Sequence, residues 1–225
     1  MQQSCIPSLS INKTDRRTFV LIDLMRKKLL FYILFFAGLF GCFYAVMVYT
    51  TDFEKVKLPI LNTVQPFTFM RQDSTMVSQA DIKQRVYVVE YFFTTCKGIC
   101  PKMNKNMKLI YDQFKADSSF LILSHTVNPE TDSIQVLSKY AETFGAQTQN
   151  WWFLTGTKEA LYRTARESYL LDDPKNSTKN IDDQFLHTQF FSLVDRMGRV
   201  RGVYDGIKKD EVEQLTKDIQ ELINE

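Results

Sequence analysis

The chain has 225 residues and a formal net charge of +2, with 44% hydrophobic and 24% charged residues. This length accommodates one or two domains, and the composition is that of a globular protein rather than a disordered chain. A charge so close to zero gives no reason to expect nucleic-acid binding. The charge is uneven, however. Residues 1–28 contain six Lys or Arg against two Asp, whereas residues 29–225 contain 22 against 24 acidic residues.

An uncharged segment, residues 29–49, follows directly after Arg26-Lys27-Lys28. About 20 apolar residues suffice to cross a bilayer as a helix, so this segment is predicted to be a single-pass transmembrane anchor. A buried helix of a soluble protein is disfavoured because such helices rarely stay uncharged for so long. Since Lys and Arg favour the cytoplasmic side, residues 1–28 are predicted to be cytoplasmic. The carboxyl-terminal domain is then exported, which in a bacterial-type cell means the periplasmic side of the inner membrane.

Two features of this end leave alternatives open. Met25-Arg26-Lys27-Lys28 resembles the start of an export signal, so the chain could also begin at Met25. Leu39-Phe40-Gly41-Cys42 resembles a lipoprotein cleavage site, although Phe40 replaces the usual small residue. The apolar run continues beyond Cys42, which a cleaved signal would not need. This favours an uncleaved anchor.

Residues 50–66 are predicted to tether the anchor to a folded domain over residues 67–225. The tether has no sustained hydrophobic period and contains two prolines, as expected of an irregular segment. Apolar residues on both sides of a polar turn predict a hairpin over residues 67–77. Ser78 is then expected to cap a short helical turn.

The central stretch of the domain, residues 87–101, combines a strand, two cysteines and the start of a helix. Residues 87–93 are β-branched, aromatic and mostly apolar, as expected of a buried central strand. Cys96 and Cys100 follow, and Pro101 suits the first turn of a helix because its φ is fixed and its missing N–H is not needed there. Thiols between a strand end and a helix start lie where backbone N–H groups and the helix dipole favour thiolate.

Downstream, apolar periods of two and of three to four residues alternate. They predict a helix over 101–114, a strand over 120–127, a helix over 134–144, a strand over 151–155, a helix over 157–169, a polar loop over 172–184, strands over 189–195 and 199–204, and a closing helix over 207–223. Strands alternating with helices, followed by a terminal hairpin and helix, predict an α/β fold of thioredoxin type with a central mixed sheet flanked by helices. About 160 residues are ample for one core, so the domain needs no disulfide for stability.

Three roles compete for Cys96 and Cys100. A structural disulfide is disfavoured because its short loop would restrain the unfolded chain little. On a regular helix the Cβ atoms of residues i and i+4 lie about 5–6 Å apart, whereas a disulfide needs about 3.8 Å. Two sulfurs bound to one ion can be up to about 4.6 Å apart. The spacing therefore favours a metal site without excluding a dithiol oxidoreductase.

The chain has two histidines, His125 and His187. His125 continues a strand, and we expect it to be packed and hydrogen-bonded in the core. Thiolates are soft ligands that favour Cu(I), and an imidazole would complete a three-coordinate set. Met103 and Met107 are also soft donors, but methionines at helical spacing are typical of a core.

Several parts of the sequence, in order, resemble the SCO/SenC family of copper proteins that assist cytochrome oxidase assembly. The similar parts are the aromatic strand before Cys96-x-x-x-Cys100-Pro101, residues 124–132, His187, residues 193–202 and residues 204–206. The resemblance spans roughly residues 65–223. It implies that Cys96, Cys100 and His187 bind copper, as Cu(I) or Cu(II). It also implies that the client is the copper subunit of a cytochrome oxidase, at its binuclear copper centre.

The sequence departs from the family pattern beside two of these residues. Lys97 stands where the family commonly has proline, and its charge is expected to favour thiolate. Leu186-His187-Thr188 replaces Asp-His-Ser, which removes a carboxylate next to the implied ligand.

The predicted function is therefore that of a membrane-anchored metallochaperone whose Cys96–Cys100 pair can also cycle through a disulfide. The alternatives are a periplasmic thiol–disulfide reductase and a redox or copper sensor without a delivery role. A thioredoxin-like oxidoreductase normally has a cis-proline just before the strand at 189–195. This chain has His187-Thr188-Gln189 there, which argues against a general dithiol enzyme.

Overall fold

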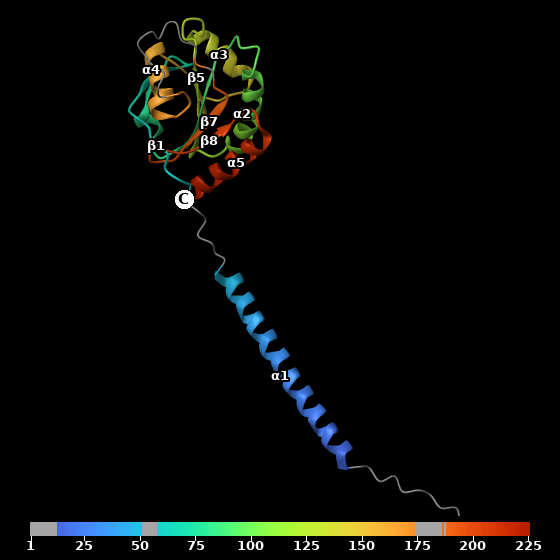
Figure 1. The fold of residues 1–225 in the computed structure, drawn as a ribbon. Helices are drawn as coiled ribbons and strands as arrows, with labels where there is room; N and C mark the ends of the chain where they lie inside the picture. The colour runs from blue at the N-terminus through green and yellow to red at the C-terminus, as the bar shows by residue number, and fades with distance from the viewer. Residues whose placement is uncertain (1–12, 51–57, 174–185, 187) are drawn as a thin grey trace, which may run out of the picture. The chain divides into compact units, whose positions relative to one another are not determined.

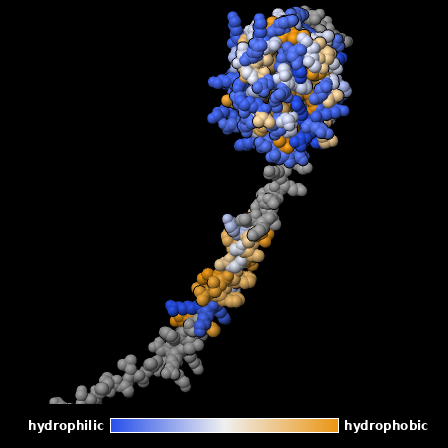
Figure 2. Space-filling model, turned by 180° about the vertical axis from the view of Figure 1, so that it is seen from behind, coloured by the Kyte–Doolittle hydropathy of each residue, from blue (hydrophilic) through white to orange (hydrophobic). Residues whose placement is uncertain are grey.

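The computed structural model describes residues 13–50, 58–173, 186 and 188–225. The chain divides into two compact units, residues 1–57 and residues 58–225. In the first unit the described part is one long helix, α1 (Lys13–Thr50). Its segment Leu24–Met47 is long and apolar enough to cross a membrane. Figure 2 shows this apolar band in orange, whereas the visible face of the second unit is mostly hydrophilic.

The second unit is built on one eight-stranded sheet with the strand order β1-β8-β7-β4-β5-β6-β2-β3 (Figure 1). Its strands are β1 (Asn62–Thr63), β2 (Thr68–Arg71), β3 (Met76–Ser78), β4 (Val86–Phe92), β5 (Phe120–Thr126), β6 (Trp151–Thr155), β7 (Phe190–Val194) and β8 (Arg199–Asp205). The central strand β4 pairs parallel with β5 and antiparallel with β7. All seven residues of β4 are buried, as the continuous apolar run predicts.

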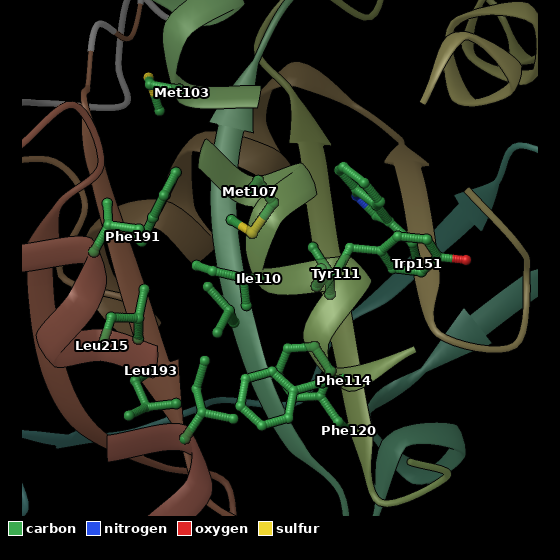
Figure 3. Close-up of a cluster of buried hydrophobic side chains, with 14 of the residues drawn as sticks. Met103, Met107, Ile110, Tyr111, Phe114, Phe120, Trp151, Phe191, Leu193 and Leu215 are labelled. Atoms are coloured by element: carbon green, nitrogen blue, oxygen red, sulfur yellow. The ribbon is translucent and has the colours of Figure 1, made fainter. Parts of the chain in front are cut away.

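Helices cover both faces of the sheet. The helical elements are α2 (Cys100–Phe114), α3 (Ile134–Thr143), α4 (Lys158–Arg163), α5 (Lys209–Asn224), a short 3-10 turn η1 (Gln79–Ile82) and a π-helical turn η2 (Thr164–Ser168). One hydrophobic cluster joins one face of the sheet to α2, α3 and α5, and the other joins the opposite face to α4 and η2. Figure 3 shows α2 in the first cluster, where Met103, Met107 and Ile110 point toward Phe191, Leu193 and Leu215. The predicted mixed α/β sandwich is confirmed.

Met103 and Met107 are fully buried core residues, as their helical spacing predicts. Ser78 accepts a hydrogen bond from the Ala80 N–H and forms a reciprocal capping box with Asp81, which explains the turn predicted there. The helix predicted over 157–169 instead changes at Thr164 into η2. Most of the predicted polar loop lies outside the described residues.

The domain begins earlier than predicted. The backbone carbonyl of Leu58 accepts hydrogen bonds from Nε and Nη2 of the buried Arg201, at 2.9 and 2.6 Å. The Leu61 N–H donates to the Val200 carbonyl at 2.8 Å, and β1 pairs antiparallel with β8. Residues 58–66 are therefore part of the fold rather than of the tether. A two-residue edge strand is too short to produce a hydrophobic period, so sequence alone does not reveal it.

Candidate metal site at the carboxyl end of β4

Cys96 and Cys100 lie just beyond the carboxyl end of β4, as predicted. Cys96 belongs to the turn before α2 and is partly exposed, whereas Cys100 is the first residue of α2 and is buried. Both thiols are free. Because Cys96 precedes the helix, the helical distance between i and i+4 does not apply to this pair. The turn brings the two thiols close enough for Cys100 to affect the pKa of Cys96.

The two thiols have opposite acidities. Burial opposes ionisation of Cys96, but hydrogen bonds from the Cys100 thiol and from backbone N–H groups outweigh it and lower the Cys96 pKa. Burial and the neighbouring Cys96 raise the pKa of Cys100 to about 12. These hydrogen bonds, rather than the predicted charge of Lys97, are the main favourable causes. The partly exposed Cys96 is thus the sulfur suited to act as thiolate.

A cavity of about 370 Å³ opens beside the cysteine pair. It is lined by Cys96 and Cys100 from the turn and α2, by apolar residues from the ends of β4 and β5, and by Leu186 and Thr188. His187 itself lies outside the described residues. Among the residues that are described, no cluster of three metal-binding side chains occurs. The described part of the site therefore supplies two soft sulfur donors and a cavity bordered by both neighbours of His187.

Asp132, for which the sequence predicted no role, fixes the turn that carries Cys96. Asp132 is fully buried and accepts hydrogen bonds from the Thr94 N–H at 3.2 Å and from the Thr94 and Thr126 hydroxyls at 2.5 Å each. These bonds join the β4–α2 turn to the end of β5 and the following loop. A carboxylate with three donors holds its neighbours in a defined geometry. Asp132 therefore positions the loop that carries Cys96.

A buried polar network lies beneath the cysteines. Glu90 of β4 is fully buried and accepts a hydrogen bond from the Ser124 hydroxyl at 2.6 Å. Ser124 in turn accepts one from Trp151 Nε1 at 2.8 Å. Burial raises the pKa of Glu90 to about 7, although the bond from Ser124 opposes the rise. A carboxyl group with this pKa gains or loses its proton near neutral pH.

Asn104 links Glu90 to Tyr140. Its side-chain nitrogen donates to the two Glu90 oxygens at 3.2 and 3.1 Å, and its side-chain oxygen accepts a hydrogen bond from the Tyr140 hydroxyl at 2.6 Å. The buried network therefore runs from Trp151 through Ser124, Glu90 and Asn104 to Tyr140.

His125 is packed in the core as predicted, but the predicted hydrogen bonding is wrong. Its ring stacks on Tyr91 at 5.0 Å and meets Phe69 edge-on at 5.0 Å. Neither ring nitrogen has a hydrogen-bond partner among the described residues. Burial lowers its pKa to about 3, so the ring is neutral at ordinary pH. His125 therefore lies within the cluster that joins the sheet to α4 and η2, and it does not line the cysteine cavity.

The fold and the site define a class. The chain carries a thioredoxin-like domain with an asymmetric pair of cysteines between a central strand and a helix. The sequence model of the SCO1/SenC family matches residues 58–224. This chain belongs to the SCO1/SenC family.

Comparisons with individual relatives support this family assignment. The SCO1 protein homolog of Bacillus subtilis (strain 168) is 31% identical over 170 residues, which cover 74% of this chain and 86% of that protein. A solved member of the Sco family of cytochrome c oxidase assembly proteins, described as containing a disulfide switch, is 30% identical with a TM-score of 0.62. That match covers 73% of this chain and 95% of the solved chain. Arabidopsis thaliana ScoI, solved with copper bound, shares the fold at 23% identity and a TM-score of 0.56, over 72% of this chain and 98% of that chain.

Proposed function

We propose that this protein binds copper through Cys96, Cys100 and His187 and assists its delivery to the binuclear copper centre of a terminal cytochrome oxidase. The observation that carries the proposal is the cavity that both cysteines share with Leu186 and Thr188. Since these two residues flank His187 in sequence, they support His187 as the third ligand. Membership of a family whose members include cytochrome c oxidase assembly proteins supports the choice of client.

The chemistry of the described donors fits copper. Two sulfurs, one with a lowered pKa, form a soft chelate, and an imidazole would supply a third ligand of the kind that copper accepts. Copper here is cargo, so the site must both hold the ion and release it. Partial exposure of Cys96 gives a receiving protein access to one sulfur, whereas buried Cys100 keeps the second in place.

A second candidate function, thiol–disulfide reduction, is favoured by the asymmetry of the pair. An exposed sulfur with a lowered pKa beside a buried one with a raised pKa is the arrangement of an attacking and a resolving thiol. The relative with a disulfide switch belongs to the same family. In this function the Cys96 thiolate attacks a client disulfide, releases one client thiolate and forms a mixed disulfide. Cys100 then attacks the Cys96 sulfur, its proton passes to the second client sulfur as that sulfur leaves, and the Cys96–Cys100 disulfide is formed.

We further propose that α1 anchors the domain on the periplasmic side of the inner membrane. The support is the apolar segment Leu24–Met47 and the basic residues at its amino end. An alkaline phosphatase fused to the carboxyl terminus should be active because the enzyme needs export. An inactive fusion, with a fluorescent cytoplasmic counterpart, would reverse the orientation.

Metal analysis of residues 58–225, reduced and loaded with Cu(I), tests the ligand set. Cys96→Ser or Cys100→Ser should abolish tight binding, since one thiolate cannot chelate. His187→Ala should weaken binding at least tenfold. His125→Phe is the matched control because it removes the other histidine, and copper binding by its folded fraction should be unchanged. Equal losses at both histidines would contradict the assignment.

Oxidase activity in cells that carry the variants distinguishes copper delivery from thiol–disulfide reduction. Copper delivery requires His187, whereas dithiol chemistry needs only the two sulfurs. In copper-poor medium, His187→Ala cells should therefore lose oxidase activity as Cys96→Ser cells do, and added copper should restore it in the histidine variant. Full activity in His187→Ala cells beside failure in Cys96→Ser cells would favour the reductase.

A further inference from the structure

One end of the domain combines exposed apolar and basic side chains close to the point where the chain enters it. We call this surface the entry face and define it as Ile60, Leu61, Lys83, Arg196 and Met197. Met197 is 72% exposed, Ile60 56% and Leu61 48%. Large apolar side chains exposed together on a soluble domain mark a surface that contacts a partner or a membrane.

Backbone hydrogen bonds hold the three segments of the entry face side by side. The Val64 N–H donates to the Gly198 carbonyl at 2.8 Å, which joins the entering chain to the β7–β8 turn. The Gln84 N–H donates to the Arg196 carbonyl at 3.3 Å, which joins that turn to the segment before β4. Arg196 is fixed further by a hydrogen bond from Nη2 to the Ile223 carbonyl at 2.7 Å. The entry face is therefore a built surface rather than a set of unrelated loops.

A cavity of about 360 Å³ lies in the entry face. Its walls contain two cations and no carboxylate, being formed by Gln79, Ile82, Lys83, Gln84, Tyr87, Arg196, Met197 and Gly198. Cations beside an exposed apolar side chain suit an anionic amphiphile, because the phosphate of a lipid headgroup and its acyl chain lie next to each other.

A membrane lies within reach of this face if α1 anchors the chain as proposed. The apolar part of α1 ends at Met47, and Leu58 is already bound by Arg201 within the domain. The ten residues between them can span at most about 35 Å. The proposed anchoring therefore supplies a bilayer that the entry face can reach.

We propose that the entry face binds the surface of the anchoring bilayer, with Lys83 and Arg196 on the phosphates of anionic lipids and Met197 in the interfacial region. The inference rests on the proposed anchoring by α1. It also has a consequence for the cysteine pair. β4 runs seven residues from Val86, near the entry face, to Phe92, or about 20 Å. Binding through the entry face thus presents the cysteines to a partner outside the membrane plane.

The test uses residues 58–225, which form a compact unit that contains both hydrophobic clusters. The domain is sedimented with vesicles of phosphatidylcholine, with and without phosphatidylglycerol. It should bind the anionic vesicles more strongly, and added salt should weaken that binding. Lys83→Gln with Arg196→Gln should lower the partition coefficient about 30-fold, and Met197→Ser about tenfold.

The matched control is Lys105→Gln with Lys139→Gln, which removes the same charge from exposed positions on α2 and α3. It should leave the partition coefficient unchanged. Equal loss in both double variants, or equal binding to neutral and anionic vesicles, would overturn the proposal. Circular dichroism confirms that each variant is folded. Anchoring by α1 is tested separately, by treating membranes that contain the full chain with alkaline carbonate. An anchored chain stays in the membrane fraction even if the entry face binds no lipid.

Discussion

At the scale of single residues, Glu90 and His125 show how burial couples protonation to stability. Both are fully buried, and burial disfavours the charged form of each. It raises the pKa of Glu90 to about 7 and lowers that of His125 to about 3. His125 therefore reduces stability as the pH falls from about 6.5 towards 3, because only the unfolded chain takes up the proton. Glu90 instead reduces stability as the pH rises from 4.5 towards 7, because only the unfolded chain loses the proton there.

Glu90→Gln should remove a pH dependence of stability. Below pH 4.5 Glu90 is protonated in both the folded and the unfolded chain. Between pH 4.5 and about 7 only the unfolded chain ionises, so the free energy of unfolding falls by about 3 kcal/mol as the pH rises. The stability of Glu90→Gln relative to wild type should therefore increase by about 3 kcal/mol from pH 4.5 to 8. Urea unfolding of the reduced, metal-free domain measures it.

The charge of Glu90 helps to raise the pKa of Cys100 and that of Tyr140. Both groups remain protonated over that pH range. Glu142→Gln, the same substitution at an exposed position on α3, controls for the loss of one negative charge. A pH-independent difference between Glu90→Gln and wild type would show that Glu90 is ionised throughout in the folded domain.

At the scale of elements, the site depends on a contact between two loops. The β4–α2 turn and the loop before α3 meet at Asp132, which accepts three hydrogen bonds. Asp132→Ala leaves those donors without an acceptor, which should cost about 1–3 kcal/mol of stability each where burial persists. Since Thr94 precedes Cys96 by two residues, copper affinity should also fall at least tenfold. Competition with a Cu(I) chelator measures this loss.

Ser133→Ala is the neighbouring control for Asp132. The Ser133 hydroxyl caps α3 by accepting from the Val136 N–H at 3.4 Å, so its loss should cost about 1 kcal/mol. The cap does not contact the Cys96 turn, and copper affinity should stay at the wild-type value. Equal copper affinities in Asp132→Ala and Ser133→Ala would show that Asp132 has no positioning role.

At the scale of the whole molecule, residues 58–66 complete the domain. They supply β1 and the carbonyl that accepts from Arg201, and they bury Val64 at 3% exposure. A chain that begins at Phe67 should therefore be about 3–5 kcal/mol less stable than one that begins at Leu58. Thermal unfolding of the two chains measures the difference. Equal unfolding midpoints would show that residues 58–66 belong to the tether rather than to the domain.

Local sequence was sufficient for much of the site. A β-branched and aromatic run, two cysteines and Pro101 predict a strand, a turn and a helix start, because each depends on neighbours within a few residues. The helical spacing of Met103 and Met107 likewise predicts their burial in the core. Alternating periods along residues 120–223 predict the order of strands and helices, and with it the fold class.

Tertiary structure decided the features that depend on residues distant in sequence. Asp132 meets Thr94 across 38 positions, and Leu58 meets Arg201 across 143. No period or motif encodes such pairs. The unequal acidities of Cys96 and Cys100 also arise only in the fold, because the turn exposes one sulfur, α2 buries the other, and backbone N–H groups converge on the first. Sequence determined which groups are present, whereas packing determined which of them are desolvated and which are hydrogen-bonded.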